Sequence, residues 1–340
     1  MSKNPASLSS LYGNIVLTLD EIDLNLDKAE KELKKMSRLR GLERLGVEKA
    51  QAEFDRFRTE YQELKEGLKE SVVFMKKTEY EKSMFSQLET FATKWLTKLD
   101  QSLGSPGAKI QNNEVFRAVG GVIRGVCTEI MCSFKHTVAT GKLLASVVEL
   151  GAAIHDKVFN KDHEPEVLQP EAQTKSRGKP LDKLDESLDM VSKCIQDAQR
   201  DLQSISGPNQ EEAGKALEML QDFNTRFDGL KAGVMEKTAG VPEARDKFYK
   251  STALGKMESF AKEWLDKITT SLGVDPKSAM PNSRISKAAI NVVKCACDVA
   301  VCAVDKAIAT GKVVASVVSL GVVVKNKVVG QTKTAQVRTI

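Results

Sequence analysis

Several residue types are scarce in this chain of 340 residues, and each scarcity argues against a class of protein. Aromatic residues make up 5% of the sequence, so stacking platforms for single-stranded nucleic acid are few, and we expect no nucleic-acid partner. Three histidines, His136, His155 and His163, leave few bases for nucleophilic catalysis. Nine prolines are also few, whereas 41% hydrophobic and 29% charged residues are typical of a water-soluble helical protein.

The sequence also lacks the hydrophobic segments typical of secreted or membrane-spanning proteins. Residues 1–14 do not show the charged-then-apolar pattern of a secretory signal. The longest strongly apolar run without a charge is Val313–Val324, twelve residues, whereas a spanning helix needs about twenty. All six cysteines fall within apolar helical patterns, which favours reduced thiols. We therefore expect a cytoplasmic protein without a signal peptide or transmembrane helix, with peripheral membrane attachment or leaderless export still open.

Heptad spacing of apolar residues is the main structural signal in the N-terminal part. One seam runs over Leu19–Met36 and a second over Val47–Leu68, separated by a short turn between Gly41 and Gly46. Two seams joined in this way predict an antiparallel, coiled-coil-like hairpin. A third helix is expected over 78–103, followed by an apolar region rich in small residues over 114–159. In that region we expect Gly141 to bend or break the helix.

The chain then repeats its own plan. Ala139–Gly151, ATGKLLASVVELG, returns as Ala309–Gly321, ATGKVVASVVSLG, with ten of thirteen letters identical at an offset of 170. The heptad seam returns at an offset of 162, where Leu181–Asp189 matches Leu19–Asp27. A period of this length is that of a domain, not of a solenoid repeat.

We therefore predict an all-α fold of two tandem, internally duplicated helical-bundle domains, each with a long antiparallel coiled-coil-like hairpin. The expected divisions are a flexible lead-in over 1–17, a first bundle over 18–159, a proline-containing linker over 160–180, a second bundle over 181–329 and a polar basic tail over 330–340.

The repeated Gly-Lys pair does not form a phosphate-binding loop. That motif needs a glycine five residues before the pair and a Ser or Thr after the lysine. Here His136 and Lys306 stand at the first position, and Leu143 and Val313 stand at the second. The simpler interpretation is close packing, in which Gly141 and Gly311 with nearby alanines let helices approach one another.

No metal or catalytic constellation is predicted. Cys295 and Cys297 are two residues apart, so they point to different sides of a helix and cannot chelate one ion. Cys132 and His136 share a helix face, but Lys306 replaces the histidine in the second copy. We predict no catalytic residues, no metal and no cofactor.

The charge of the chain is unevenly distributed. Residues 277–340 contain ten basic and two acidic residues, a net charge of +8 within a chain total of +5, which leaves −3 for residues 1–276. Together with the apolar run beside it, this segment is a candidate for binding an anionic surface. The candidate residues are Lys277, Arg284, Lys287, Lys294, Lys306, Lys312, Lys325 and Lys327.

These features predict a non-catalytic protein-interaction or scaffold protein that presents amphipathic helical arms to protein partners whose identity the sequence does not indicate. One alternative is a peripheral membrane protein that uses the basic C-terminal region on an anionic membrane surface. A second is an enzyme of an unfamiliar type. Self-association of the heptad seams into a homo-oligomer is a further open interpretation.

Overall fold

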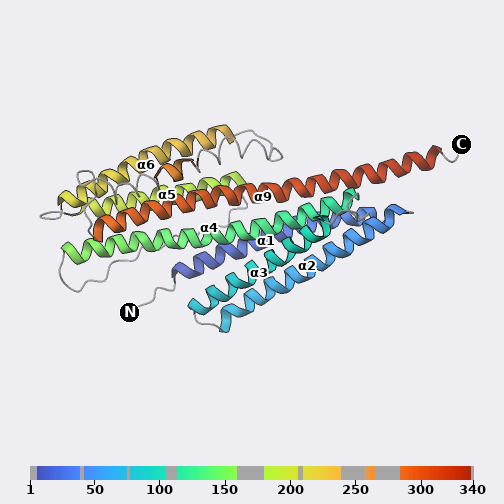
Figure 1. The fold of residues 1–340 in the computed structure, drawn as a ribbon, viewed down its shortest axis with the longest axis horizontal. Helices are drawn as coiled ribbons and strands as arrows, with labels where there is room; N and C mark the ends of the chain where they lie inside the picture. Colours follow the sequence, from blue (N-terminus) through green and yellow to red (C-terminus); the bar gives the residue numbers. More distant parts are fainter. Residues whose placement is uncertain are drawn as a thin grey trace. The chain divides into compact units, whose positions relative to one another are not determined.

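The computed structural model describes residues 6–38, 42–74, 77–104, 113–158, 180–205, 210–238, 257, 259–264 and 284–337. Within these ranges every regular element is a helix and no strand occurs, which confirms the all-α prediction (Figure 1). The helices are α1 (Ala6–Lys34), the short 3-10 helix η1 (Lys35–Arg38), α2 (Leu42–Phe74), α3 (Lys77–Gly104), α4 (Glu114–Val158), α5 (Pro180–Gln203), α6 (Gln210–Thr238) and α9 (Arg284–Val337).

Both ends of the chain are more helical than the sequence analysis predicts. The lead-in expected over 1–17 is part of α1 from Ala6 onward, because Leu8, Tyr12 and Ile15 continue the heptad spacing upstream of Leu19. The tail expected over 330–340 is part of α9 as far as Val337. The linker expected over 160–180 lies outside the described residues except for its last residue, Pro180, which begins α5.

Two predicted helix breaks are also wrong. Gly46 lies inside α2 and does not flank a turn. Helices α4 and α9 continue without interruption past Gly141 and Gly311 (Figure 1). A single interior glycine costs a helix only about 1 kcal/mol relative to alanine. The apolar faces of these long helices offset that cost.

The described chain forms two compact units, and neither unit follows a single copy of the repeat. One unit, the α1–α3 unit, consists of 16–134 and 309–340, and the other, the α5–α6 unit, consists of 1–15 and 135–308. Each of the long helices α4 and α9 therefore contributes one half to each unit. The tandem bundles predicted over 18–159 and 181–329 have different boundaries from these units.

In the α1–α3 unit, α1 and α2 are joined by buried polar contacts. The Tyr61 hydroxyl donates a hydrogen bond to the Leu19 carbonyl oxygen at 2.7 Å. Nearby, Lys65 pairs with Asp20 at 2.7 Å and also with Asp23. Burial lowers the pKa of Lys65, but its hydrogen bonds to Asp20 and Asp23 outweigh this effect and raise the pKa overall. The lysine therefore stays charged between the two helices.

In the α5–α6 unit, α5 and α6 make a comparable contact. Lys231 of α6 pairs with Asp185 at 3.3 Å and with Asp189, both on α5. The Ser192 hydroxyl donates to the Asp228 carboxylate at 2.8 Å. Lys65 and Lys231 thus bridge to paired aspartates within their own units, and they are 166 residues apart in the chain.

Each unit contains an aromatic cluster. In the α1–α3 unit, the Phe57 ring meets the Trp95 ring edge-on with centroids 5.1 Å apart, and the Phe91 ring at 5.5 Å. In the α5–α6 unit, Phe223 meets Trp264 edge-on at 5.1 Å and Phe260 at 5.4 Å. The large rings and their mutual geometry make these clusters the anchors of the two cores.

Within the α1–α3 unit, α4 and α9 run antiparallel and approach closely. A Cβ on Gly125 would lie 3.1 Å from Val313 Cγ2 and 3.3 Å from Val313 Cα. One turn earlier on α4, a Cβ on Gly121 would lie 3.6 Å from Ser316 Oγ. A Cβ on Gly311, in contrast, would have no atom within 4 Å. Close packing therefore depends on Gly125, whereas a Cβ on Gly121 would make an ordinary contact, and the predicted packing role of Gly311 is wrong.

Candidate functional site

The predicted basic residues do not gather at one place. Arg284, Lys287, Lys294 and Lys306 belong to the half of α9 in the α5–α6 unit, and Lys312, Lys325 and Lys327 to the half in the α1–α3 unit. Lys277 lies outside the described residues. Only the second group lies beside exposed apolar side chains, so the candidate site narrows to the C-terminal half of α9.

Exposed apolar side chains mark this half of α9. Val318 is 59% exposed and Val322 is 52% exposed, while Val313, Val317 and Leu320 on the other side of the helix are buried. The helical repeat places Val314, Val318, Val322 and Lys325 in one stripe, which we call the valine–lysine face. Two valines exposed in adjacent turns form a small apolar patch, which makes this face the candidate contact surface.

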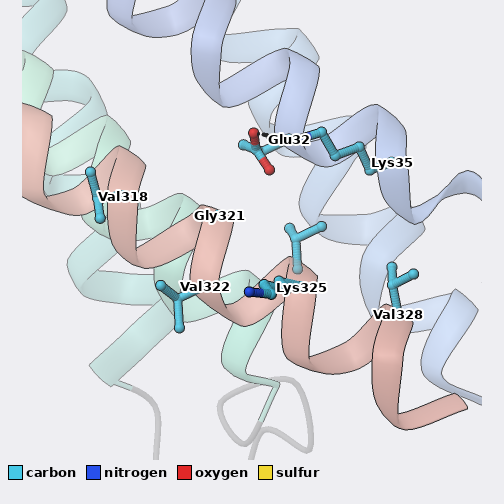
Figure 2. A pocket seen from close by; sticks show the side chains of 8 residues that line it. Glu32, Lys35, Val318, Gly321, Val322, Lys325 and Val328 are labelled. Carbon is cyan, nitrogen blue, oxygen red and sulfur yellow. Dashed lines mark hydrogen bonds and ion pairs between the residues drawn. The ribbon is translucent and has the colours of Figure 1, made fainter. Parts of the chain in front are cut away.

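A groove runs beside this face, between α9 and α1 (Figure 2). Its cavity volume is about 450 Å³. Glu32 of α1 and Lys35 of η1 contribute two charged side chains, and the Lys35 ammonium donates to the Glu32 carboxylate at 2.6 Å. Glu32 also packs near Gly321, where an added Cβ would lie 3.6 Å from its carboxyl carbon. The lining residues are Glu32, Lys35, Val318, Gly321, Val322, Val324, Lys325 and Val328.

Helix α1 adds to the exposed apolar surface of the same unit. Leu24 is 51% exposed and Leu17 is 36% exposed. Within the described part of the chain, these two leucines together with Val318 and Val322 are the large apolar side chains that remain exposed. All four belong to the α1–α3 unit, so the exposed large apolar side chains of the described residues are confined to that unit.

The matching face of α4 has a different character. At the offset of 170, Val318 matches Val148, Ser319 matches Glu149, Val322 matches Ala152 and Lys325 matches His155. Val148 and Ala152 are half-buried, and Glu149 is exposed. The face of α4 is therefore smaller in apolar volume and carries a negative charge that α9 lacks.

Helices α4 and α9 are both long and apolar enough to cross a membrane by length and composition, over Glu114–His155 and Arg284–Val328. The sequence analysis, which considered runs without any charge, expects no such helix. The core helix of a water-soluble protein can be equally long and apolar. It differs from a membrane-spanning helix in being mostly buried within its own protein. In the most apolar stretch of α4, 50% of the residues are buried, whereas in the most apolar stretch of α9 only 28% are buried.

Buried polar groups occur elsewhere but do not form a reactive site. The Thr310 hydroxyl donates to the buried Glu129 carboxylate at 2.7 Å in the α1–α3 unit. In the α5–α6 unit, burial first and the charge of Lys306 second lower the pKa of His136 to about 3. A neutral, enclosed imidazole of this kind is a poor general base near neutral pH.

Two buried cysteines are unreactive for a similar reason, because burial disfavours their thiolate forms. Burial raises the pKa of Cys127 and Cys297 to about 12, so their thiols stay protonated near neutral pH. Among the described residues all six are free thiols, and no group of three or more His, Cys, Asp or Glu side chains is placed to hold a metal ion. The described side chains therefore give no support for a catalytic or metal centre.

Comparison of the chain with protein-family models, with curated proteins and with solved structures finds no match. Its function therefore has to be inferred from its own residues. Sequence reasoning located the basic C-terminal region but did not identify Val318, Val322 or the groove beside α1. The signal was present in α9, which is apolar on all sides between Lys312 and Lys325.

Proposed function

We propose that this protein is a non-catalytic interaction protein that binds a partner through the valine–lysine face of α9 and the adjoining groove. The supporting observation is the exposure of Val318 and Val322, each more than half accessible on a helix whose opposite side is buried. Apolar area left in water costs about 25 cal/mol per Å², so covering this face with a partner is favourable. The remainder of the fold is the scaffold that holds the face in place.

The buried side of α9 makes that scaffold rigid at the site. Val313, Leu320 and Val324 are almost fully buried in the α1–α3 unit. The Thr310–Glu129 hydrogen bond fixes the rotation of α9 one turn before the face begins. A face held in this way is pre-organised, which lowers the entropy cost of binding.

We also propose that the chain arose by internal duplication and that α1–α2 and α5–α6 are equivalent coiled-coil-like hairpins. Two features support this. The aromatic clusters have matching members and nearly equal ring distances, 5.1 Å for both Phe–Trp pairs. Lys65 and Lys231 bridge to aspartates on the preceding helix of the same unit. The duplicated copies then differ most on the face that α9 exposes.

Site-directed photo-crosslinking in cells tests the proposed contact. A photo-reactive amino acid placed at Val318 or Val322 should form covalent adducts with a protein or lipid partner. The control position is Thr90, an exposed residue of α3 in the same unit. Equal labelling from Val322 and Thr90, or no adduct from either valine, would contradict the proposal.

A further inference from the structure

The charge around the valine–lysine face indicates the chemistry of its partner. From Lys306 to Ile340 the sequence has six basic residues and no acidic residue. The acidic side chain in the groove lining, Glu32, is ion-paired with Lys35 at 2.6 Å. Glu32, Lys35 and Lys325 are the three charged side chains of the lining, and their net charge is +1. The surface therefore favours an anionic partner.

The burial of one side of α9 limits how a lipid bilayer could be contacted. Val313, Val317 and Leu320, which lie in the uncharged run Val313–Val324, are buried within the α1–α3 unit. A helix that is covered on one side by its own unit can lie in the interface, with its open face toward the acyl chains.

We infer that the valine–lysine face docks on an anionic membrane surface. Val318 and Val322 enter the boundary between headgroups and acyl chains, and Lys325 extends its apolar stem so that its ammonium binds lipid phosphate or carboxylate groups. The inference rests on the proposed function of this face as the contact surface, and it names the occupant. The low burial of the apolar stretch of α9, 28%, is what separates it from an ordinary core helix.

A protein helix seated in the groove is the competing occupant. The acidic side chain of the groove, Glu32, is already paired with Lys35, and the C-terminal part of α9 adds only basic side chains, which favours an anionic lipid surface over a helix that carries charges of both signs. The face also lacks the Trp and Phe that strengthen interfacial helices. Binding to lipid must therefore depend strongly on electrostatic attraction, so it should weaken as salt screens the lysines.

Vesicle flotation with the full-length chain tests this inference. We expect binding to phosphatidylcholine vesicles that contain phosphatidylserine, and release at high salt or when phosphatidylserine is omitted. Lys325→Gln should lower the vesicle partition coefficient about fivefold. Replacing both Val318 and Val322 with serine should lower it by more than about tenfold. Helical content measured by circular dichroism should stay unchanged in both variants.

A fluorescence measurement locates the face that touches lipid. Trp95 and Trp264 are almost fully buried, so a new tryptophan at an exposed position dominates the response to lipid. Val322→Trp should shift to shorter wavelengths and be quenched by brominated acyl chains. Thr90→Trp on α3 is the matched control and should show neither effect.

A second variant uses the counterpart on α4. Placing the α4 residues on α9, as Ser319→Glu, Val322→Ala and Lys325→His, should abolish anionic vesicle binding.

Failure of the wild-type chain to bind anionic vesicles at low salt would overturn the inference, as would quenching at Thr90→Trp but not at Val322→Trp. If the chain ignores vesicles but Val322 crosslinks to one protein, the membrane inference fails while the proposed contact face stands. If the chain neither binds anionic vesicles nor crosslinks at Val322, both the membrane inference and the proposed contact face are wrong.

Discussion

At the scale of single residues, the most unusual side chain is His136. It is almost fully buried, and within the described structure its Nε2 atom has no hydrogen-bond partner. Burial penalises the charged imidazole, and the nearby Lys306 ammonium penalises it further, which together lower the pKa to about 3. The histidine is therefore a neutral core side chain, and its protonation by acid destabilises the folded protein.

Protonation of His136 should make the folded state sensitive to acid. An unfolded chain binds the proton near pH 6.5, whereas the folded chain resists it down to about pH 3. The unfolded state therefore binds more protons between these values, and stability should fall as pH falls, by up to about 1.4 kcal/mol per unit. Urea unfolding at pH 7 and pH 5 should show that His136→Gln loses about 2 kcal/mol less than wild type over this interval.

His155→Gln is the control for this measurement, because His155 is the other histidine among the described residues and is only half-buried. This variant should retain the pH dependence of the wild-type chain. If His136→Gln also retains it, acid sensitivity comes from the carboxylates and not from the buried imidazole.

At the scale of elements, the approach of α4 to α9 in the α1–α3 unit depends on one glycine of α4, Gly125. Gly121 and Gly125 are four residues apart and lie on one side of the helix, against Ser316 and Val313. The nearest backbone atom is Val313 Cα, which would lie 3.3 Å from a Cβ built on Gly125. A methyl group at Gly125 therefore has to displace backbone, not just a flexible side chain.

Two alanine substitutions should have opposite effects on stability. Gly125→Ala should destabilise the protein by about 1–3 kcal/mol, because the new methyl group overpacks the contact with Val313. Gly311→Ala should stabilise it by up to about 1 kcal/mol, since a Cβ there meets nothing within 4 Å and alanine favours the helix. Urea unfolding measures both. A gain in stability for Gly125→Ala would show that the helices are farther apart than described.

The helices show which features local sequence patterns can predict. The third helix, expected over 78–103, is observed as Lys77–Gly104, because its apolar spacing and its terminal glycine are local signals. The serine-rich start of α1 was not predicted, since composition outweighed the spacing of Leu8, Tyr12 and Ile15. The break expected at Gly141 was wrong, because the packing that compensates a glycine is not visible in the local sequence.

The candidate site could likewise be predicted from the sequence only in part. The lysines and the apolar run of α9 were identifiable from composition alone. Which valines would be exposed was not, because this depends on the side of α9 that packs within the α1–α3 unit. The contribution of Glu32 and Lys35, almost three hundred residues earlier in the chain, required the three-dimensional structure.

At the scale of the whole molecule, the repeat in the sequence and the compact units divide the chain differently. The first predicted bundle ends at residue 159, near the end of α4, but the α1–α3 unit is completed by residues 309–340. The α5–α6 unit likewise needs residues 135–158 of α4. Sequence periodicity cannot predict this exchange of helix halves, because the similar apolar patterns over 18–159 and 181–329 fit their own helices and those of the other predicted bundle equally well.

Separating the copies tests this exchange. A fragment of residues 1–170 contains Gly121, Gly125 and the buried face of α4 but lacks Val313, Leu320 and the other α9 residues that cover it. We expect fragments 1–170 and 171–340 to be unstable alone, with broad thermal transitions, and to recover a cooperative transition when mixed. Sedimentation of the mixture should show a one-to-one complex. If each fragment instead unfolds cooperatively by itself with the stability of the intact chain, the copies are autonomous tandem domains, and the exchange of α4 and α9 halves is wrong.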